Sequence, residues 1–261
     1  MLRMLLSLPF YILVLWVIKR NGHSIKASNK TYAWAIGMGI LGYYLSSLFD
    51  FIGLQYISAG IERIILFIYP TLAVLINYWV FKIPIVKRQW WAILVTYLGI
   101  GLAYWSEINQ FQNTSLFIYG SIMVLLCGIT YAMYLVGTGK IIPQLGATQY
   151  TTVAMLSASL GIFIHYLAQE PITDLGSYLA PNNPIFLYII GLALFATVIP
   201  SFLLNTGMKR IGSNDLAIIT SIGPVATLFQ ARYLLGEPFS LLQILGTILV
   251  IIGVLMVKQS K

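Results

Sequence analysis

The chain has 261 residues, of which 59% are hydrophobic and only 8% are charged. Charged residues make up about a quarter of an ordinary soluble domain, so this composition excludes one and indicates a membrane protein. The net charge of +8 does not predict a nucleic-acid partner, because the basic residues lie in tails and loops between apolar segments. The single cysteine, Cys127, excludes a disulfide or a thiolate metal site within one chain.

Nine segments are predicted to span a membrane, since a span needs roughly 20 mainly apolar residues. They cover residues 2–18, 32–54, 59–81, 88–105, 116–138, 149–167, 185–206, 214–235 and 241–257. The first resembles the core of a signal peptide, but Lys19 and Arg20 follow its apolar run, so we interpret it as a span. Backbone groups in lipid must be hydrogen-bonded within each segment, which predicts an all-α polytopic fold.

The basic residues fall mainly on one side of these spans. That side holds twelve of the fifteen Lys and Arg residues: Lys19, Arg20, Lys26, Lys30, Lys82, Lys87, Arg88, Lys140, Lys209, Arg210, Lys258 and Lys261. Loops rich in Lys and Arg stay in the cytoplasm. The prediction therefore places the protein in the cell membrane with its N-terminus outside and its C-terminus in the cytoplasm.

Two stretches of the chain align with each other without a gap. Residues 53–102 lie over residues 207–256 at a constant offset of 154, with nine identities in fifty positions. The identities include residues that fix backbone geometry, namely Gly53, Pro70, Pro84 and Gly99, which match Gly207, Pro224, Pro238 and Gly253. This self-similarity indicates an internal duplication.

The two copies are predicted to cross the membrane in opposite directions. The turn from Lys82 to Arg88 is basic, whereas its counterpart around Glu237 is acidic. Inverted repeats of this kind are typical of secondary transporters, whose two halves form a site near the membrane midplane. We expect a first half of four spans at 1–105, an outer linker at 106–115 and a second half of five spans at 116–258.

Several short motifs resemble the EamA family of the drug/metabolite transporter superfamily. They are residues 57–63 (ISAGIER), the triplet Tyr69-Pro70-Thr71, and Gly236-Glu237-Pro238 with Gln243, Gly246 and Gly253. The resemblance covers nearly the whole chain and implies ten helices in two inverted five-helix halves that carry amino acids, other metabolites or drugs. This chain differs in two respects: the first helix is missing, and Ile83 stands where the second repeat has Glu237. A misassigned start and a genuinely shortened protein would each explain the missing helix.

Charged residues inside the spans are the first candidates for a substrate site, because each costs roughly 2.5 kcal/mol or more at a helix centre. Arg63 shares a predicted helix face with Phe67 and Pro70, and Glu62 and Asp50 lie near the same end of their spans. We hypothesise that Asp50, Glu62, Arg63 and Phe67 line a cavity. In the structural alternative, Glu62 and Arg63 cap a helix and Asp50 pairs with Arg63. Proton uptake by Asp50 is a further alternative.

Prolines and polar side chains supply the remaining candidates. Pro70 and Pro224 occupy equivalent mid-span positions and are expected to kink their helices. Candidate cavity residues on other spans are Tyr131, Tyr134, Asn205, Thr220, Thr227 and Gln230. Each of these polar residues alone is more often a helix-packing contact than a substrate ligand.

Together these features predict a secondary transporter that moves a small metabolite, amino-acid-like or drug-like, by alternating access. The expected partners are the lipid bilayer, the substrate, and a proton or counter-substrate as the driving solute, because no GxxxxGK loop for ATP is present. No catalytic residue, metal or cofactor is expected. Two alternatives stay open: a non-transporting membrane subunit or regulator and, less favoured, a membrane-embedded enzyme.

Overall fold

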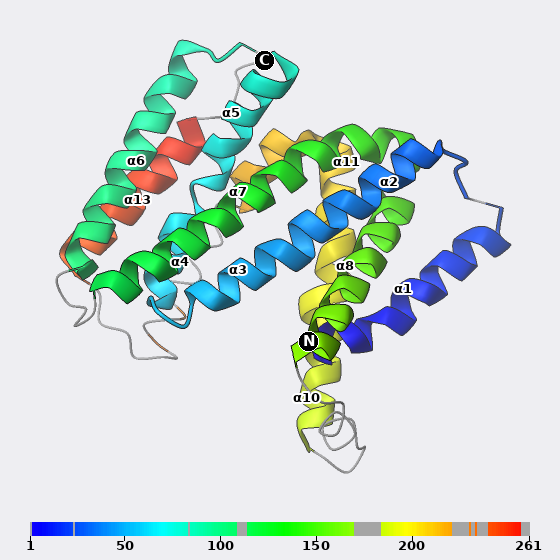
Figure 1. Cartoon of the computed structure of the whole chain (residues 1–261). Helices are drawn as coiled ribbons and strands as arrows, with labels where there is room; N and C mark the ends of the chain where they lie inside the picture. The colour runs from blue at the N-terminus through cyan, green and yellow to red at the C-terminus, as the bar shows by residue number, and fades with distance from the viewer. Residues whose placement is uncertain are drawn as a thin grey trace. The chain divides into compact units, whose positions relative to one another are not determined.

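The computed structural model describes residues 2–22, 24–82, 84–108, 114–169, 184–220, 230, 233 and 240–256. Its elements are α1 (Leu2–Arg20), α2 (Asn29–Gly39), η1 (Ile40–Leu45), α3 (Ser46–Gly53), α4 (Ala59–Leu66), α5 (Tyr69–Phe81), α6 (Lys87–Ile108), α7 (Thr114–Leu145), α8 (Ala147–Gln169), α10 (Pro184–Ala193), η3 (Leu194–Val198), α11 (Ile199–Thr220) and α13 (Leu241–Met256). All of these elements are helical, and η1 and η3 are π-helices (Figure 1).

Six helical stretches of the described chain are long and apolar enough to cross a membrane. They are Leu2–Arg20, Asn29–Gly53, Ala59–Phe81, Thr114–Leu145, Ala147–Ala168 and Phe186–Gly212, and Leu241–Met256 is a shorter apolar helix. The protein is therefore an all-helical, multi-pass membrane protein. The predicted span at 88–105 forms part of α6, which is not one of these six, and most of the predicted span at 214–235 lies outside the described residues, so the number nine remains a prediction.

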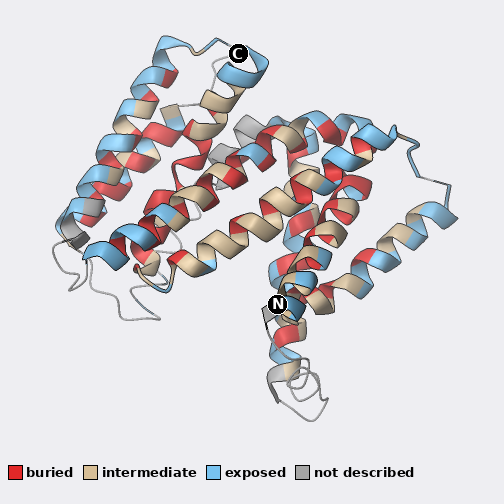
Figure 2. Cartoon of the chain, in the orientation of Figure 1, coloured by how far each residue is buried: buried red, intermediate tan, exposed pale blue. Residues whose placement is uncertain are grey.

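The tryptophans show how the helices meet lipid. All six are exposed, between 55% and 68%, and each lies within five residues of a helix end. Soluble proteins bury most of the surface of a tryptophan, whereas membrane proteins concentrate this residue at the two interfaces of the bilayer. Figure 2 shows the accompanying pattern along the helices, in which buried positions alternate with exposed ones. This pattern suits helices that pack on one face and contact lipid on the other.

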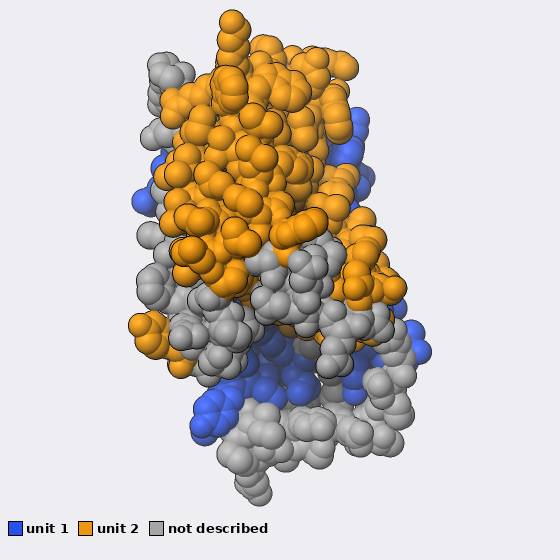
Figure 3. All heavy atoms as spheres, turned by 90° about the vertical axis from the view of Figure 1, so that its left-hand side faces the viewer, with its two compact units in different colours: residues 1–44, 137–212 blue, residues 45–136, 213–261 orange. Residues whose placement is uncertain are grey.

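The chain forms two compact units, which Figure 3 shows in different colours. Unit 1 comprises residues 1–44 and 137–212, and unit 2 comprises residues 45–136 and 213–261. The chain passes between them inside η1, inside α7 and after Gly212, whose φ of 80° interrupts α11. Each unit therefore contains helices from both halves predicted from the sequence.

Unit 1 is held together by α1, α8 and the η3 region. Its apolar cluster consists of Met4, Tyr11, Met155 and Val198. The hydroxyl groups of Tyr11 and Ser201 lie 2.9 Å apart, so the one polar atom of this tyrosine is paired where the ring is fully buried. Helices α2 and α8 approach closely because Gly39 contacts the Ala154 backbone.

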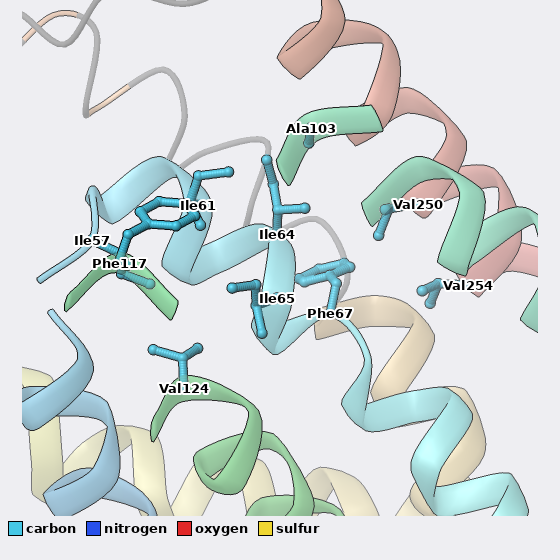
Figure 4. Close-up of a cluster of buried hydrophobic side chains, with 10 residues drawn as sticks. All are labelled: Ile57, Ile61, Ile64, Ile65, Phe67, Ala103, Phe117, Val124, Val250 and Val254. Atoms are coloured by element: carbon cyan, nitrogen blue, oxygen red, sulfur yellow. The ribbon is translucent and has the colours of Figure 1, made fainter. Parts of the chain in front are cut away.

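Unit 2 has a larger apolar cluster centred on α4. Figure 4 shows its ten buried side chains, which come from α4 and its flanking turns, α6, α7 and α13: Ile57, Ile61, Ile64, Ile65, Phe67, Ala103, Phe117, Val124, Val250 and Val254. The buried α4 residues 61, 64 and 65 follow helical spacing, so one face of this short helix is anchored. The cluster fixes α4 against its neighbours and thereby positions its two charged residues, Glu62 and Arg63.

Helices α6 and α13 run antiparallel in unit 2, and glycines form the seam between them. A Cβ atom at Gly99 would lie 2.5 Å from the Gly246 carbonyl oxygen and 2.8 Å from the Val250 nitrogen. At the other end of the seam, Gly253 contacts Ala92 and Thr96. Gly99 and Gly253 are aligned residues of the two sequence copies, and so are their partners, Ala92 with Gly246 and Thr96 with Val250. The seam thus contains two equivalent contacts, one around Gly99 and one around Gly253.

The π-helices follow the same offset. Shifting η1 (Ile40–Leu45) by 154 residues gives 194–199, and η3 occupies Leu194–Val198. The order α2, η1, α3 therefore recurs as α10, η3, α11, although the sequence alignment begins only at Gly53. A π-helix is a rare local widening of the helix, so its recurrence at matched positions is a structural likeness beyond shared apolar composition.

Candidate functional site

A close contact between α3 and α7 positions the first candidate residue, Asp50. A Cβ atom at Gly53 would lie 2.9 Å from the Gly120 carbonyl oxygen, and one at Gly120 would lie 3.0 Å from the Gly53 carbonyl oxygen. Only glycine at both positions permits this approach without displacing backbone. Asp50 lies one turn before Gly53, and its Oδ1 atom is buried. The short α3 thus directs a carboxyl group towards the interior of unit 2.

The start of α4 positions Glu62 and Arg63. The Ser58 hydroxyl caps this helix by accepting a hydrogen bond of 3.2 Å from the Ile61 backbone nitrogen. Glu62, in the first turn, has an exposure of 0%, whereas the Arg63 side chain is 42% exposed. Arg63 Nε lies 2.9 Å from Glu62 Oε2, although its N–H does not point along a hydrogen bond. Arg63 and Glu62 are therefore close enough for an ion pair, but the Nε–H group does not form a hydrogen bond with the carboxylate.

The span that contains Pro70 is divided into two helices. Helix α4 ends at Leu66, and α5 begins at Tyr69 with Pro70 in its first turn. Proline has no N–H to donate to the carbonyl four residues earlier, and its ring crowds that turn. The Ile68 carbonyl at the break accepts two hydrogen bonds, one of 3.0 Å from the Leu72 backbone nitrogen and one of 2.7 Å from the Thr71 hydroxyl. The break changes the helical register after Phe67.

An aromatic group adjoins this break. Tyr69 contacts Phe67 and Tyr131 edge to face, with ring centroids 6.2 and 5.2 Å apart. Tyr131 stacks on Tyr134 at 5.7 Å. The predicted residues Phe67, Tyr131 and Tyr134 are thus brought together, and Tyr69 joins them. A single continuous helix would have directed Tyr69 away from Arg63 and Phe67, so a smooth periodicity does not identify it.

The other predicted site residues are placed elsewhere. Asn205 belongs to unit 1, where it is fully buried and donates to the Ser201 carbonyl at 3.1 Å and to the Tyr43 hydroxyl at 3.5 Å. Thr220 is the last residue of α11, and its side chain is not described. Thr227 and Pro224 lie outside the described residues, and Gln230 is exposed. The candidate residues that the structure describes in unit 2 are therefore Asp50, Glu62, Arg63 and the aromatic group.

The chemistry of this site is that of two carboxyl groups, one guanidinium and several aromatic rings. In the described part of the chain, no group of three or more His, Cys, Asp or Glu residues is arranged to hold a metal ion. Such a set can bind charge and apolar surface together. With the helices described above, it defines an integral, multi-pass membrane protein that carries a charged group inside one of its units.

The chain belongs to the EamA-like transporter family, which matches residues 1–105 and 118–259. It is similar to the uncharacterized transporter YcbK of Bacillus subtilis (strain 168), at 29% identity over 94% of this chain and 77% of the relative. It also resembles the uncharacterized transporter YyaM of the same organism, at 24% identity over 94% of this chain and 79% of the relative. A protein crystal structure matches with a TM-score of 0.68 and 15% identity, over 98% of this chain and 85% of the other, which shows a common fold.

Proposed function

We propose that this protein is a secondary transporter that moves a small metabolite across the cell membrane by alternating access between two inverted repeats. The observation that carries the proposal is the α6 to α13 seam. Helices related by an internal duplication lie antiparallel there, with aligned residues making the same contact twice. A two-fold axis in the membrane plane relates helices in this way, and repeats of that symmetry are typical of secondary transporters.

Two further features support the repeat. The π-helices recur at the same offset, and the two segments matched by the family, 1–105 and 118–259, correspond to the proposed halves. In addition, α5 ends at Phe81, and the C-cap residue Lys82 has a φ of 55°, a left-handed conformation that favours glycine. The residue 154 positions later is Gly236. The sequence of the second copy thus has glycine, the residue that this conformation favours, at the position aligned with Lys82.

The substrate site is proposed at the charged and aromatic group of unit 2. Buried charge inside a membrane span is costly, so its presence in the same unit as the stacked tyrosines favours a binding role over a purely structural one. A small polar or amphipathic solute fits this mixture of charge and ring surface. The relatives named as transporters are consistent with such a role.

Comparative metabolite analysis tests the function. The same host strain would produce wild-type protein, the Arg63→Ala variant, or neither, and small molecules would be measured inside the cells and in the medium. We expect at least one metabolite to change its inside-to-outside ratio with the wild type and not with Arg63→Ala. Lys19→Ala, which removes an exposed charge at the end of α1, is the control and should behave as wild type. Identical profiles for wild type and empty host would contradict the proposal.

A further inference from the structure

The Asp50 and Glu62 carboxyl groups form an incompletely satisfied pair in the interior of unit 2. Both oxygens of Glu62 and Oδ1 of Asp50 are buried, and none of them receives a hydrogen bond from a described residue. Both carboxyl groups lie on helices that pack on α7: Asp50 is one turn before Gly53, which contacts Gly120, and Glu62 is on α4, whose apolar cluster includes Phe117 and Val124. When both carboxyl groups are ionised, neither has a proton to donate, so their buried oxygens remain acceptors without a donor.

Arg63 compensates only part of this charge. It is one guanidinium beside two carboxylates, its Nε is 2.9 Å from Glu62 but misdirected, and its side chain is 42% exposed. Removing charge from water costs several kcal/mol per ion unless partners and hydrogen bonds replace the water. With both carboxylates ionised, the group carries an excess of one negative charge in an apolar environment.

The described segments of α5, α6, α7 and α13 that surround the α4 cluster supply no other compensating charge. There is no acidic or basic side chain in α5, in α13, in residues 89–106 of α6 or in residues 114–136 of α7. The titratable groups on those segments are tyrosines and Cys127. Arg63 is thus the single cation that these elements bring to the pair.

We propose that Asp50 and Glu62 together hold one exchangeable proton, which is the coupling ion of the transporter. One proton placed between the two carboxyl groups supplies the missing donor and leaves a pair with one negative charge, which the Arg63 guanidinium balances. Two carboxyl groups that share a site bind such a proton as a unit. Protons would enter and leave the pair on the side of the half-exposed Arg63 side chain.

The inference rests on the proposed function for its role in transport, but the proton itself can be detected without any substrate. Each release of the proton leaves the pair with an uncompensated charge. A transport cycle in which the pair releases its proton therefore needs something else to stabilise that charge. Either a cationic group of the substrate or water, in a conformation that admits it, would do so. The substrate and the proton would accordingly influence each other's binding.

Infrared difference spectroscopy on the purified protein tests the proposal, with pH as the only variable. A protonated carboxyl group has a carbonyl stretch that carboxylates lack, and this band shifts in heavy water if the proton exchanges. We expect such a band in the wild type, and we expect it to be absent in Glu62→Gln and in Asp50→Asn, because in each variant an amide donor replaces the shared proton. The control Glu107→Gln, at the end of α6, should retain the band.

Folding of the variants is checked separately. Asp50→Glu keeps two carboxyl groups and should keep a band at an altered frequency, which separates loss of the proton from loss of structure. A wild-type protein without the band would overturn the proposal, as would a band that survives in either Glu62→Gln or Asp50→Asn. If the band behaves as expected while no metabolite is transported, the proton site stands and the proposed function fails.

Discussion

The contact at Gly99 gives the sharpest prediction for the fold. A Cβ atom there would lie 2.5 Å from the Gly246 carbonyl oxygen and 2.8 Å from the Val250 nitrogen, about 1 Å closer than van der Waals contact allows. Since the obstructing atoms are backbone, α6 and α13 must separate along the seam. Overpacking of this kind costs roughly 1–3 kcal/mol. We therefore expect Gly99→Ala to lower the free energy of unfolding by that amount.

The same helix supplies a matched control two residues away. A Cβ atom at Gly101 meets nothing within 4 Å. Gly101→Ala should therefore stabilise the protein by about 0.4–1 kcal/mol, because alanine restricts the unfolded chain and favours helix. Thermal unfolding of the detergent-purified variants, followed by tryptophan fluorescence, measures both effects. Equal Tm values for the two variants, or a lower Tm for Gly101→Ala than for Gly99→Ala, would refute the reasoning.

Three further substitutions test other parts of the fold by the same Tm measurement. Gly39→Ala should destabilise unit 1, because the added methyl meets the Ala154 backbone, while Gly37→Ala, which meets nothing within 4 Å, should not; equal effects would count against the α2 to α8 contact. Tyr44→Phe removes a 2.6 Å hydrogen bond to His165 Nδ1 and should cost about 0.5–1.5 kcal/mol; an unchanged Tm would contradict that bond. Lys82→Gly should raise stability by about 1 kcal/mol, since glycine adopts the left-handed helix end without strain; a lower Tm would argue against it.

The membrane helices and the charged residues of the site could be predicted from the sequence. Apolar runs of helical length identify the spans, and charges within them are so rare that Asp50, Glu62 and Arg63 stand out. The alignment at offset 154 also predicted that Gly99 and Gly253 are equivalent. These features depend on neighbours along the chain or on composition, which a sequence displays directly.

Other features depend on contacts that no local pattern encodes. The helix break before Pro70 changes the register, and Tyr69 consequently meets Tyr131 in a way that a continuous helix would not allow. Gly53 and Gly120 are far apart in the sequence, so their mutual contact follows only from the packing of α3 on α7. Likewise, the sequence shows Glu62 and Arg63 only as two adjacent charged residues, whereas packing buries Glu62 and leaves Arg63 half-exposed.

Most directly, the central claim of inverted repeats is tested by thiol labelling at two aligned turns, Ile83 and Glu237. Single cysteines would be introduced at these positions in a protein whose buried Cys127 is replaced by serine, and the cells would be treated with a membrane-impermeant maleimide. We expect intact cells to label Glu237→Cys, and Ile83→Cys to react only after permeabilisation. Labelling of both cysteines from the same side of the membrane would contradict the account.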